Sequence, residues 1–374
     1  MKTIFFLLLF TTLSFAGDED RVPRVDPGYL GSFSIDAQNA LGFSNMIHSA
    51  VGEIASANPA SLDNFSEIAI GVDFHFQTVS EKTLSNFSQK ITYAKSWLPA
   101  SFGFVLPLKN WRVGLGFSRK YSEQNEINSY LILLPDGIKN ELKAEEESII
   151  YSPSFMASYS FGNLFTQEDR LIIGGQFFWN TWKVEGNIGE ETSNLKTSGI
   201  NWKAGILYRV NRYFGMGLTY ESKFLAEGTL ESSIGSIVYK NTKSFITPSR
   251  LALGVELSAT ERLSVAGTVV SYFWSEVKDN YKNSLNISFN TICKISEPLS
   301  ISLGFYQLNR IYEPSDSFLN RGETIGFLSA GIKAAVQNFD LRLEVLDSRL
   351  FSSDRHKFTV GKIGLDYVFD MPIK

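Results

Sequence analysis

The chain has 374 residues, of which 14% are aromatic and 20% charged, and its formal net charge at pH 7 is -4. This charge supplies no basic surface for phosphate groups, so the composition excludes nucleic acid as the partner. The single cysteine, Cys293, excludes an intramolecular disulfide framework and is interpreted as a small apolar residue of a sheet.

The N-terminus has the pattern of an export signal. Lys2 supplies a positive start, Ile4 to Phe10 form an unbroken apolar run, and Ser14 and Ala16 are small residues suited to a cleavage point. The apolar run is far shorter than the about 20 residues that a membrane-spanning helix needs. We therefore expect residues 1–16 to be a cleaved signal peptide, the alternative being an N-terminal membrane anchor.

Residues 17–66 differ in texture from the rest of the chain. They are rich in small residues, lack a sustained period and end in Asn58-Pro59-Ala60. Asp36 is suited to cap one short helix, and residues 49–57 are suited to form another that stops before the proline. We expect a compact, poorly periodic segment ahead of the strands.

From Glu67 onward the pattern changes to a period of two. In residues 67–77 apolar side chains occupy every second position, and small or polar ones fill the positions between them. The mean hydropathy is -0.04, and no later apolar run reaches the length of a membrane-spanning helix. About fourteen such two-faced segments are predicted, an even number, as closed single-chain bacterial barrels have. They cover residues 67–79, 89–107, 111–122, 147–161, 170–186, 196–210, 212–228, 242–258, 261–277, 283–297, 298–310, 322–337, 338–350 and 356–370.

The connections between these segments alternate in length. Lys109-Asn110, Asn211 and Thr260-Glu261 are tight, whereas residues 123–147 and 313–323 read as long polar loops. Short turns at one end and long loops at the other are typical of outer-membrane barrels. A soluble sheet sandwich gives no reason for such sorting.

Charged residues of the predicted strands share one face. Arg112, Glu256, Lys362 and Asp366 all fall opposite the apolar face, where a Lys or Arg would cost about 2 to 4 kcal/mol at the midplane of a bilayer. Unpaired edge groups cost several kcal/mol each in hydrocarbon, so a lipid-facing sheet must close. The sequence predicts an all-β fold, a closed antiparallel transmembrane β-barrel over residues 67–370, followed by a short C-terminal tail at 371–374.

Two stretches resemble one family. The small-residue segment that ends in Asn58-Pro59-Ala60 and runs into the first strand resembles the FadL/TodX (OMPP1) family of outer-membrane transporters for hydrophobic compounds. Residues 247–277, TPSRLALGVELSATERLSVAGTVVSYFWSEV, resemble the late hairpin of that family. The resemblance implies fourteen strands, with residues 17–66 folded into the lumen as a hatch or plug. PorV-like barrels of secretion systems resemble the chain more distantly and share the Asn-Pro-Ala segment without transporting lipid.

The hatch offers candidate residues. Asn58, Pro59 and Ala60 are predicted to fix it to the barrel wall, the alternative being a plain turn before a strand. Another set, Phe43, Met46 and Ile47, is a candidate apolar surface for a ligand, the alternative being packing within the hatch.

Pro153 removes a hydrogen bond from its strand and is a candidate break in the wall, the alternative being a simple strand start. The histidines, His48, His75 and His356, lack the spacing of metal ligands, so neither a metal nor a cofactor is predicted. No motif supports catalysis, so the chain is not predicted to be an enzyme. Glu145 to Glu147 are expected to be solvated loop residues, suited to bind divalent cations at a lipopolysaccharide surface.

Two functions stay open. The first is an outer-membrane channel that takes up hydrophobic small molecules, such as long-chain fatty acids or aromatic hydrocarbons, gated by the hatch. The second is a barrel that transports nothing and scaffolds an envelope or secretion complex through its loops. Both place the chain in the outer membrane of a Gram-negative type cell, among lipid and lipopolysaccharide, with an envelope protein as a further candidate partner.

Overall fold

The computed structural model describes residues 43–83, 89–93, 99–131, 140–162, 164–188, 191–234, 236–277, 282–309, 324–351 and 356–370. The predicted signal peptide, the first part of the predicted hatch and the predicted tail lie outside these residues. In the described ranges, no helix has the length and apolar character needed to cross a membrane.

The described residues form one large antiparallel sheet and three short 3₁₀ helices. The helices are η3 (Val51–Glu53), η4 (Pro59–Asn64) and η5 (Trp274–Glu276). The strands are β1 (Ala69–Thr83), β2 (Gln89–Tyr93), β3 (Pro99–Leu108), β4 (Trp111–Leu131), β5 (Asn140–Gly162), β6 (Arg170–Ile188), β7 (Glu191–Arg209), β8 (Phe214–Glu221), β9 (Phe224–Ile234), β10 (Ile237–Thr247), β11 (Arg250–Thr260), β12 (Leu263–Tyr272), β13 (Ser284–Ser296), β14 (Leu299–Leu308), β15 (Ile325–Val336), β16 (Phe339–Asp347) and β17 (His356–Val368).

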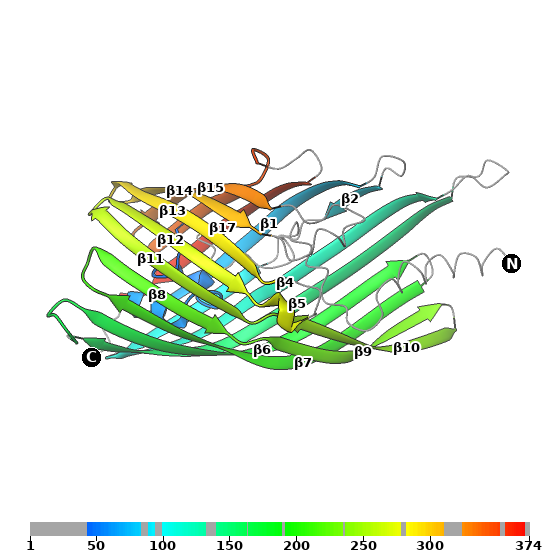
Figure 1. The fold of residues 1–374 in the computed structure, drawn as a ribbon, viewed down its shortest axis with the longest axis horizontal. Coiled ribbons are helices and arrows are strands. Elements are labelled where there is room, and N and C mark those ends of the chain that lie inside the picture. The colour runs from blue at the N-terminus through cyan, green and yellow to red at the C-terminus, as the bar shows by residue number, and fades with distance from the viewer. Residues whose placement is uncertain are drawn as a thin grey trace.

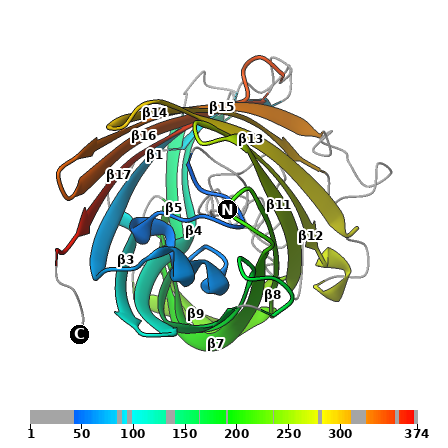
Figure 2. The same ribbon diagram turned by 90° about the vertical axis from the view of Figure 1, so that its left-hand side faces the viewer.

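The sheet closes into a barrel. β1 pairs with β17 along an antiparallel ladder that runs from Ala69 opposite Val368 to Glu81 opposite His356. β2 with β3, β8 with β9, and β10 with β11 each continue one wall strand across an interruption, so the described wall has fourteen strands (Figures 1 and 2). The predicted closed barrel is confirmed, and no sheet edge is left unpaired by the first and last strands.

Most strand positions agree with the prediction, but three hairpins extend further than expected, and η5 replaces the end of the segment predicted over 261–277. β7 begins at Glu191 instead of residue 196, and β9 ends at Ile234 and β10 begins at Ile237, although the prediction leaves residues 229–241 outside the strands. Residues 123–147, expected to be a polar loop, mostly extend the wall, because β4 runs to Leu131 and β5 begins at Asn140 with paired backbones. Glu145 to Glu147 therefore lie in the β5 ladder and not in a loop. The sequence of residues 123–147 lacks the sustained alternation that marked the other strands, because a hairpin that extends beyond the bilayer needs no lipid-facing side.

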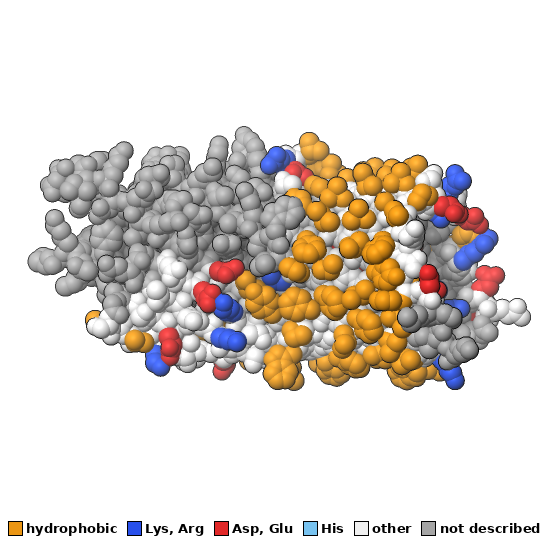
Figure 3. All heavy atoms as spheres, turned by 180° about the vertical axis from the view of Figure 1, so that it is seen from behind, with side chains coloured by type: hydrophobic (Ala, Val, Ile, Leu, Met, Phe, Trp, Pro, Cys, Tyr) orange, Lys and Arg blue, Asp and Glu red, His pale blue; other side chains and the backbone are white. Residues whose placement is uncertain are grey.

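The two faces of β11 and of β17 separate as predicted. On β11, Leu251, Leu253 and Leu257 point outward and are 38%, 53% and 53% exposed, whereas Glu256 is buried. Lys362 and Asp366 of β17 are likewise buried in the lumen, and apolar side chains form a continuous band on the outer surface (Figure 3). This band is what a lipid bilayer requires of a barrel wall.

Residues 43–66, named here the inner segment, lie inside the barrel (Figure 2). The wall makes room for them with glycines, because a Cβ atom on Gly174 would lie 2.5 Å from the amide nitrogen of Ala60 and one on Gly116 would lie 2.9 Å from Cβ of Ala55. Backbone without side chains thus lets the inner segment approach closely. Wall glycines that face it are Gly71, Gly103, Gly114, Gly116, Gly174, Gly205, Gly217 and Gly254.

Candidate functional site

The Asn-Pro-Ala tripeptide joins the inner segment to the wall. Asn58 caps η4, since its Oδ1 accepts a hydrogen bond of 3.0 Å from the amide of Ala60, and Pro59 is the first helical residue. Nδ2 of Asn58 donates to the carbonyl oxygens of Met46 (3.3 Å) and of Ile206 on β7 (3.2 Å). The expected helix across residues 49–57 is wrong, because only η3 forms there and the proline begins the next helix.

The candidate ligand residues lie in a packed cluster. Met46 and Ile47 are 1% and 3% exposed, and Phe43 is half-buried with its amide donating to Oε1 of Glu344 at 3.0 Å. This arrangement matches the packing alternative, and a role in ligand binding stays a prediction. Met46 and Ile47 form this cluster with Ala60, Ile172, Leu207, Ala252 and Val270.

A buried set of charges fastens the inner segment where the barrel closes. We call it the seam network, and its members are Glu53, Asp73, Arg342, Glu344, Lys362 and Asp366. Arg342 lies 2.7 Å from Asp73 and 3.4 Å from Asp366, while Lys362 pairs with both glutamates. Asp366 also accepts hydrogen bonds from the amides of Val51 (3.2 Å) and Gly52 (3.0 Å) in η3.

Glu53 is the member that the inner segment contributes. Burial alone would raise the pKa of its carboxyl, but the nearby Lys362 and Arg342 cations outweigh burial and lower this pKa to about 2. Glu53 is therefore ionised at any physiological pH. The sequence placed Lys362 and Asp366 on the lumen face but gave no sign of their partners, which are about 300 residues away in η3.

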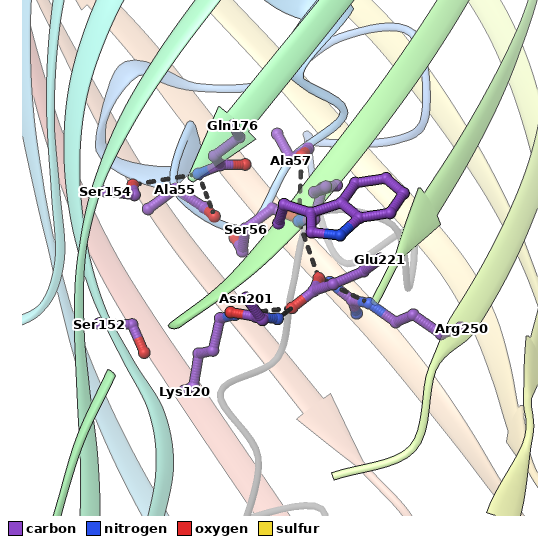
Figure 4. A network of polar contacts seen from close by, with 12 residues as sticks. Ala55, Ser56, Ala57, Lys120, Ser152, Ser154, Gln176, Asn201, Glu221 and Arg250 are labelled. Atoms are coloured by element: carbon purple, nitrogen blue, oxygen red, sulfur yellow. Dashed lines mark hydrogen bonds and ion pairs between the residues drawn. The ribbon is translucent and has the colours of Figure 1, made fainter. Parts of the chain in front are cut away.

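A second polar set lies on β4, β7, β8 and β11, on the part of the wall away from the β1–β17 closure (Figure 4). We call it the lumen network, and it comprises Lys120, Asn201, Lys203, Glu221 and Arg250. Oε1 of Glu221 accepts from Lys120 (2.6 Å) and Asn201 (3.1 Å), and its Oε2 accepts from Arg250 (2.6 Å) and lies 3.3 Å from Lys203. Three cations thus surround one carboxylate, and the site carries an excess of positive charge.

Lys203 connects this network to the inner segment. Its Nζ donates to the carbonyl oxygens of Ser56 (3.0 Å) and Ala57 (3.3 Å), and its side chain is fully buried. Gln176 of β6 makes a neutral contact of the same kind, donating to the carbonyl oxygen of Ala55 at 2.9 Å. On this side Lys203 and Gln176 hold the inner segment together with two further contacts to β7: Asn58 donates to the carbonyl oxygen of Ile206, and Arg209 donates to Oδ1 of Asn64.

Irregularities of the wall strands position the lumen network. Lys120 is the extra residue of a bulge in β4, where Arg119 and Tyr121 pair with consecutive residues of β5. Glu221 is the last residue of β8 and Arg250 is the first of β11, so both stand at strand interruptions and pair with each other. Bulges and breaks redirect side chains and recur beside functional sites.

Pro153 lies beside the lumen network, because the neighbouring Ser152 is connected through Asn180 to Asn201. Opposite β6 the ladder lacks rungs at residues 152 and 153, while Pro153 still pairs with Phe117 of β4. Ser152 bridges the missing rung by donating to Oδ1 of Asn180 at 2.6 Å. The strand-start alternative is wrong because β5 begins thirteen residues earlier, at Asn140, and the wall interruption is confined to these rungs.

Apolar side chains lie in the lumen on the far side of the lumen network from the inner segment. Trp182 is 3% exposed and donates from Nε1 to the hydroxyl of Ser148 at 2.9 Å, and the Nζ of Lys120 lies 3.3 Å from the ring centroid of Phe178. The buried members, named the apolar cluster, are Ile150, Trp182, Val184, Leu195, Phe224 and Ala226. Along the barrel axis the inner segment, the lumen network and the apolar cluster therefore follow one another.

The histidines do not lie together: His75 is opposite Lys362 of the seam network in the β1–β17 ladder, and the other two are elsewhere. Nε2 of His48 pairs with Glu256 at 3.2 Å, His75 lies in β1 and His356 begins β17. Within the described ranges, no group of three or more His, Cys, Asp or Glu residues is placed to hold a metal ion. The sequence analysis missed Lys203, Glu221 and Arg250 altogether, although each falls on the polar face of its strand.

The geometry defines a class: a closed fourteen-stranded barrel with an apolar outer band and a segment of its own chain folded into the lumen. No protein-family model matches the sequence, and no curated protein matches it. Solved structures do. The toluene transporter TodX of Pseudomonas putida has a TM-score of 0.64 at 14% identity, with 89% of this chain and 97% of that chain covered.

Two further structures give the same result. The toluene transporter TbuX of Ralstonia pickettii has a TM-score of 0.63 at 14% identity, covering 89% of this chain and 97% of that one. A FadL homologue of Pseudomonas aeruginosa has a TM-score of 0.64 at 11% identity, covering 90% of this chain and all of the other. The resemblance to the FadL/TodX family is thus confirmed at the level of the fold, over most of the chain.

Proposed function

We propose that this protein is an outer-membrane channel for the uptake of hydrophobic small molecules and that the inner segment is its gate. The proposal is supported by the fold, which it shares with proteins described as transporters of toluene and as a FadL homologue. The observation that carries it is the succession of an apolar cluster, a cationic network and a blocking segment inside one closed barrel. Capture, recognition and gating each have a structural counterpart in this order.

The lumen network favours an amphiphile with a carboxylate over a neutral hydrocarbon. Lys120, Lys203 and Arg250 face the single carboxylate of Glu221, and the side chains of Lys120 and Arg250 are 21% and 13% exposed. Charge-assisted hydrogen bonds from lysine or arginine to a carboxylate are roughly twice as strong as neutral ones. A long-chain fatty acid would satisfy these cations with its head and pack its chain against the apolar cluster.

The mechanism follows from the layers. A hydrophobic molecule enters from the end that carries the long β4–β5 hairpin, loses water against the apolar cluster and places its polar end at the lumen network. The inner segment then moves from the glycine seat, which is the set of wall glycines that face it, and the molecule passes into the wall or the periplasm. The chain is exported through its N-terminal signal, and its apolar band is surrounded by outer-membrane lipid and lipopolysaccharide.

Uptake and binding test the proposal together. A deletion strain is given radiolabelled dodecanoate or toluene, with wild-type chain or Lys120→Met supplied in trans. Wild type is expected to restore dodecanoate uptake, and Lys120→Met to weaken dodecanoate binding about 10- to 100-fold, since a hydrogen bond to a charged group contributes about 1.5 to 3 kcal/mol. Lys240→Met is the matched control, because Lys240 forms an exposed pair with Glu231 away from the lumen network.

Each outcome decides between the candidates. Restored toluene uptake without dodecanoate uptake would keep the channel and overturn the carboxylate preference. If neither compound enters and a stable envelope partner co-purifies with the full chain, the scaffold alternative replaces the channel.

A further inference from the structure

Among the cations of the lumen network, Lys203 alone donates hydrogen bonds to the described carbonyl oxygens of the inner segment. Its ammonium has three donors, and three acceptors surround it: the carbonyl oxygens of Ser56 and Ala57 and Oε2 of Glu221. The ammonium is thus saturated. If a carboxylate forms a further hydrogen bond with this ammonium, Lys203 must lose its hydrogen bond to a carbonyl of the inner segment.

Glu221 is shared unequally at present. Arg250 approaches Oε2 to 2.6 Å and Lys120 approaches Oε1 to 2.6 Å, whereas Lys203 stays at 3.3 Å. The two cations that hold Glu221 closely are also the two with partly exposed side chains, whereas Lys203 is fully buried. An incoming carboxylate therefore meets Lys120 and Arg250 before it can meet Lys203.

We infer that Lys203 is a positioning residue that couples occupancy of the lumen network to release of the inner segment. This inference rests on the proposed function. A ligand carboxylate that takes Lys120 and Arg250 leaves Glu221 with Lys203 as its remaining cation. Glu221 then draws the Lys203 ammonium from the carbonyls of Ser56 and Ala57, because a carboxylate is a stronger acceptor than a neutral carbonyl.

The coupling is reciprocal. If a bound carboxylate loosens the inner segment, a loosened inner segment must strengthen carboxylate binding by the same factor. Gln176 supplies the matched comparison, because it also donates to a carbonyl of the inner segment but bonds otherwise only to Ser154 at 3.0 Å. Its loss removes a contact of similar geometry without touching the charges.

Hydrogen exchange of residues 51–60 measures the coupling in the full mature chain held in lipid nanodiscs. Sodium dodecanoate is expected to raise the exchange rate of wild type about tenfold, a coupling typical of linked sites, and dodecan-1-ol to leave it unchanged. Lys203→Met is expected to exchange faster without any ligand and to give no response to dodecanoate. Gln176→Leu is expected to exchange faster without ligand and to keep the dodecanoate response.

A parallel equilibrium dialysis with radiolabelled dodecanoate separates the two proposals. Dodecanoate that binds wild type without changing the exchange of residues 51–60 overturns the coupling and leaves the channel standing. Absence of dodecanoate binding overturns the carboxylate ligand and the coupling with it. A dodecanoate response in Lys203→Met equal to that of wild type also overturns the coupling.

Lys203→Gln decides the matter where Lys203→Met does not fold to a heat-modifiable barrel. Its amide can still donate to the carbonyls of the inner segment but carries no charge. We expect exchange near the wild-type rate and no response to dodecanoate. A full response in this variant contradicts the role given to the ammonium.

Discussion

The seam network and the lumen network hold the same inner segment from opposite parts of the wall, and they differ in sign and in exposure. The seam network has four carboxylates and two cations, all of them 8% exposed or less. The lumen network has three cations and one carboxylate, and its outer cations are 13% and 21% exposed. The seam network is sealed from solvent and has two more carboxylates than cations, whereas the lumen network offers unbalanced positive charge to the lumen.

The difference teaches which side of the inner segment is suited to stay and which to move. Breaking a fully buried ion pair leaves an uncompensated charge, so the seam network opposes any movement. On the other side, Lys203 of the lumen network holds the inner segment through hydrogen bonds to neutral carbonyls, which we expect the binding of an anion to weaken. We expect the inner segment to pivot on the seam while its Lys203 side is released.

Replacing Arg342 is the strongest way to break the seam. Arg342→Met leaves Asp73 and Asp366 buried without their cation, and we expect the free energy of unfolding to fall by about 3 to 5 kcal/mol. Urea unfolding followed by tryptophan fluorescence measures the loss. Lys333→Met is the control, because its partly exposed pair with Asp340 should contribute at most about 1 kcal/mol. Equal unfolding curves for the two variants would remove the stabilising role of the seam.

The glycine seat can be filled without touching either network. A side chain on Gly174 of β6 would overlap the backbone of Pro59 and Ala60, so Gly174→Val is expected to displace the inner segment at a cost of about 1 to 3 kcal/mol and raise ion conductance across planar bilayers. The control is Gly175→Val, because a Cβ atom there meets nothing within 4 Å. Similar conductance from both variants would show that the seat does not hold the segment.

Asn58 sharpens the comparison at smaller scale. Asn58→Ala loses the cap of η4 and two hydrogen bonds, one of them to the β7 wall, and the cap alone contributes about 1 kcal/mol. Hydrogen exchange of residues 59–64 should rise at least about fivefold. Ser56→Ala removes only a bond of 3.0 Å within the segment, to the carbonyl of Glu53, and should change it less. The reverse order would argue against Asn58 as a wall contact.

Acid should weaken the contacts between the inner segment and the seam network, and this is the smallest of the expected effects because it is absent near neutral pH. The pKa of Glu53 is about 2 in the folded protein, below its ordinary value of 4.5, so its contribution is complete above about pH 4.5 and is lost as the pH falls through about 2. The protection factors of residues 51–57, which correct the exchange rates for the intrinsic rate at each pH, should fall across that window in wild type. Glu53→Gln should exchange faster at neutral pH and lack this dependence on Glu53 ionisation. An unchanged acid response in that variant would assign it to other carboxyls.

The sequence predicted the barrel because each wall strand repeats the same two-faced pattern, and a pattern of period two survives in any register. It failed where the strands continue without a sustained alternation of apolar and polar residues, as in residues 123–147. The charged networks were hidden for another reason. Lys120 meets Glu221 across 101 positions, and Glu53 meets Lys362 across 309, so their contact depends on strand registers that a single sequence does not reveal. The position of Lys203 on the polar face of its strand was the one signal in the sequence that it points into the lumen.

The glycines that seat the inner segment determine what remains when it departs. On β6, Gly174 lies between the inward-facing side chains of Ile172 and Gln176, so departure of the inner segment would expose backbone peptide groups between these side chains. If the proposed gating holds, a passing molecule would meet neutral groups here after it has left the cations of the lumen network. We therefore expect recognition of a carboxylate head to be complete before the molecule reaches the wall that the inner segment now covers.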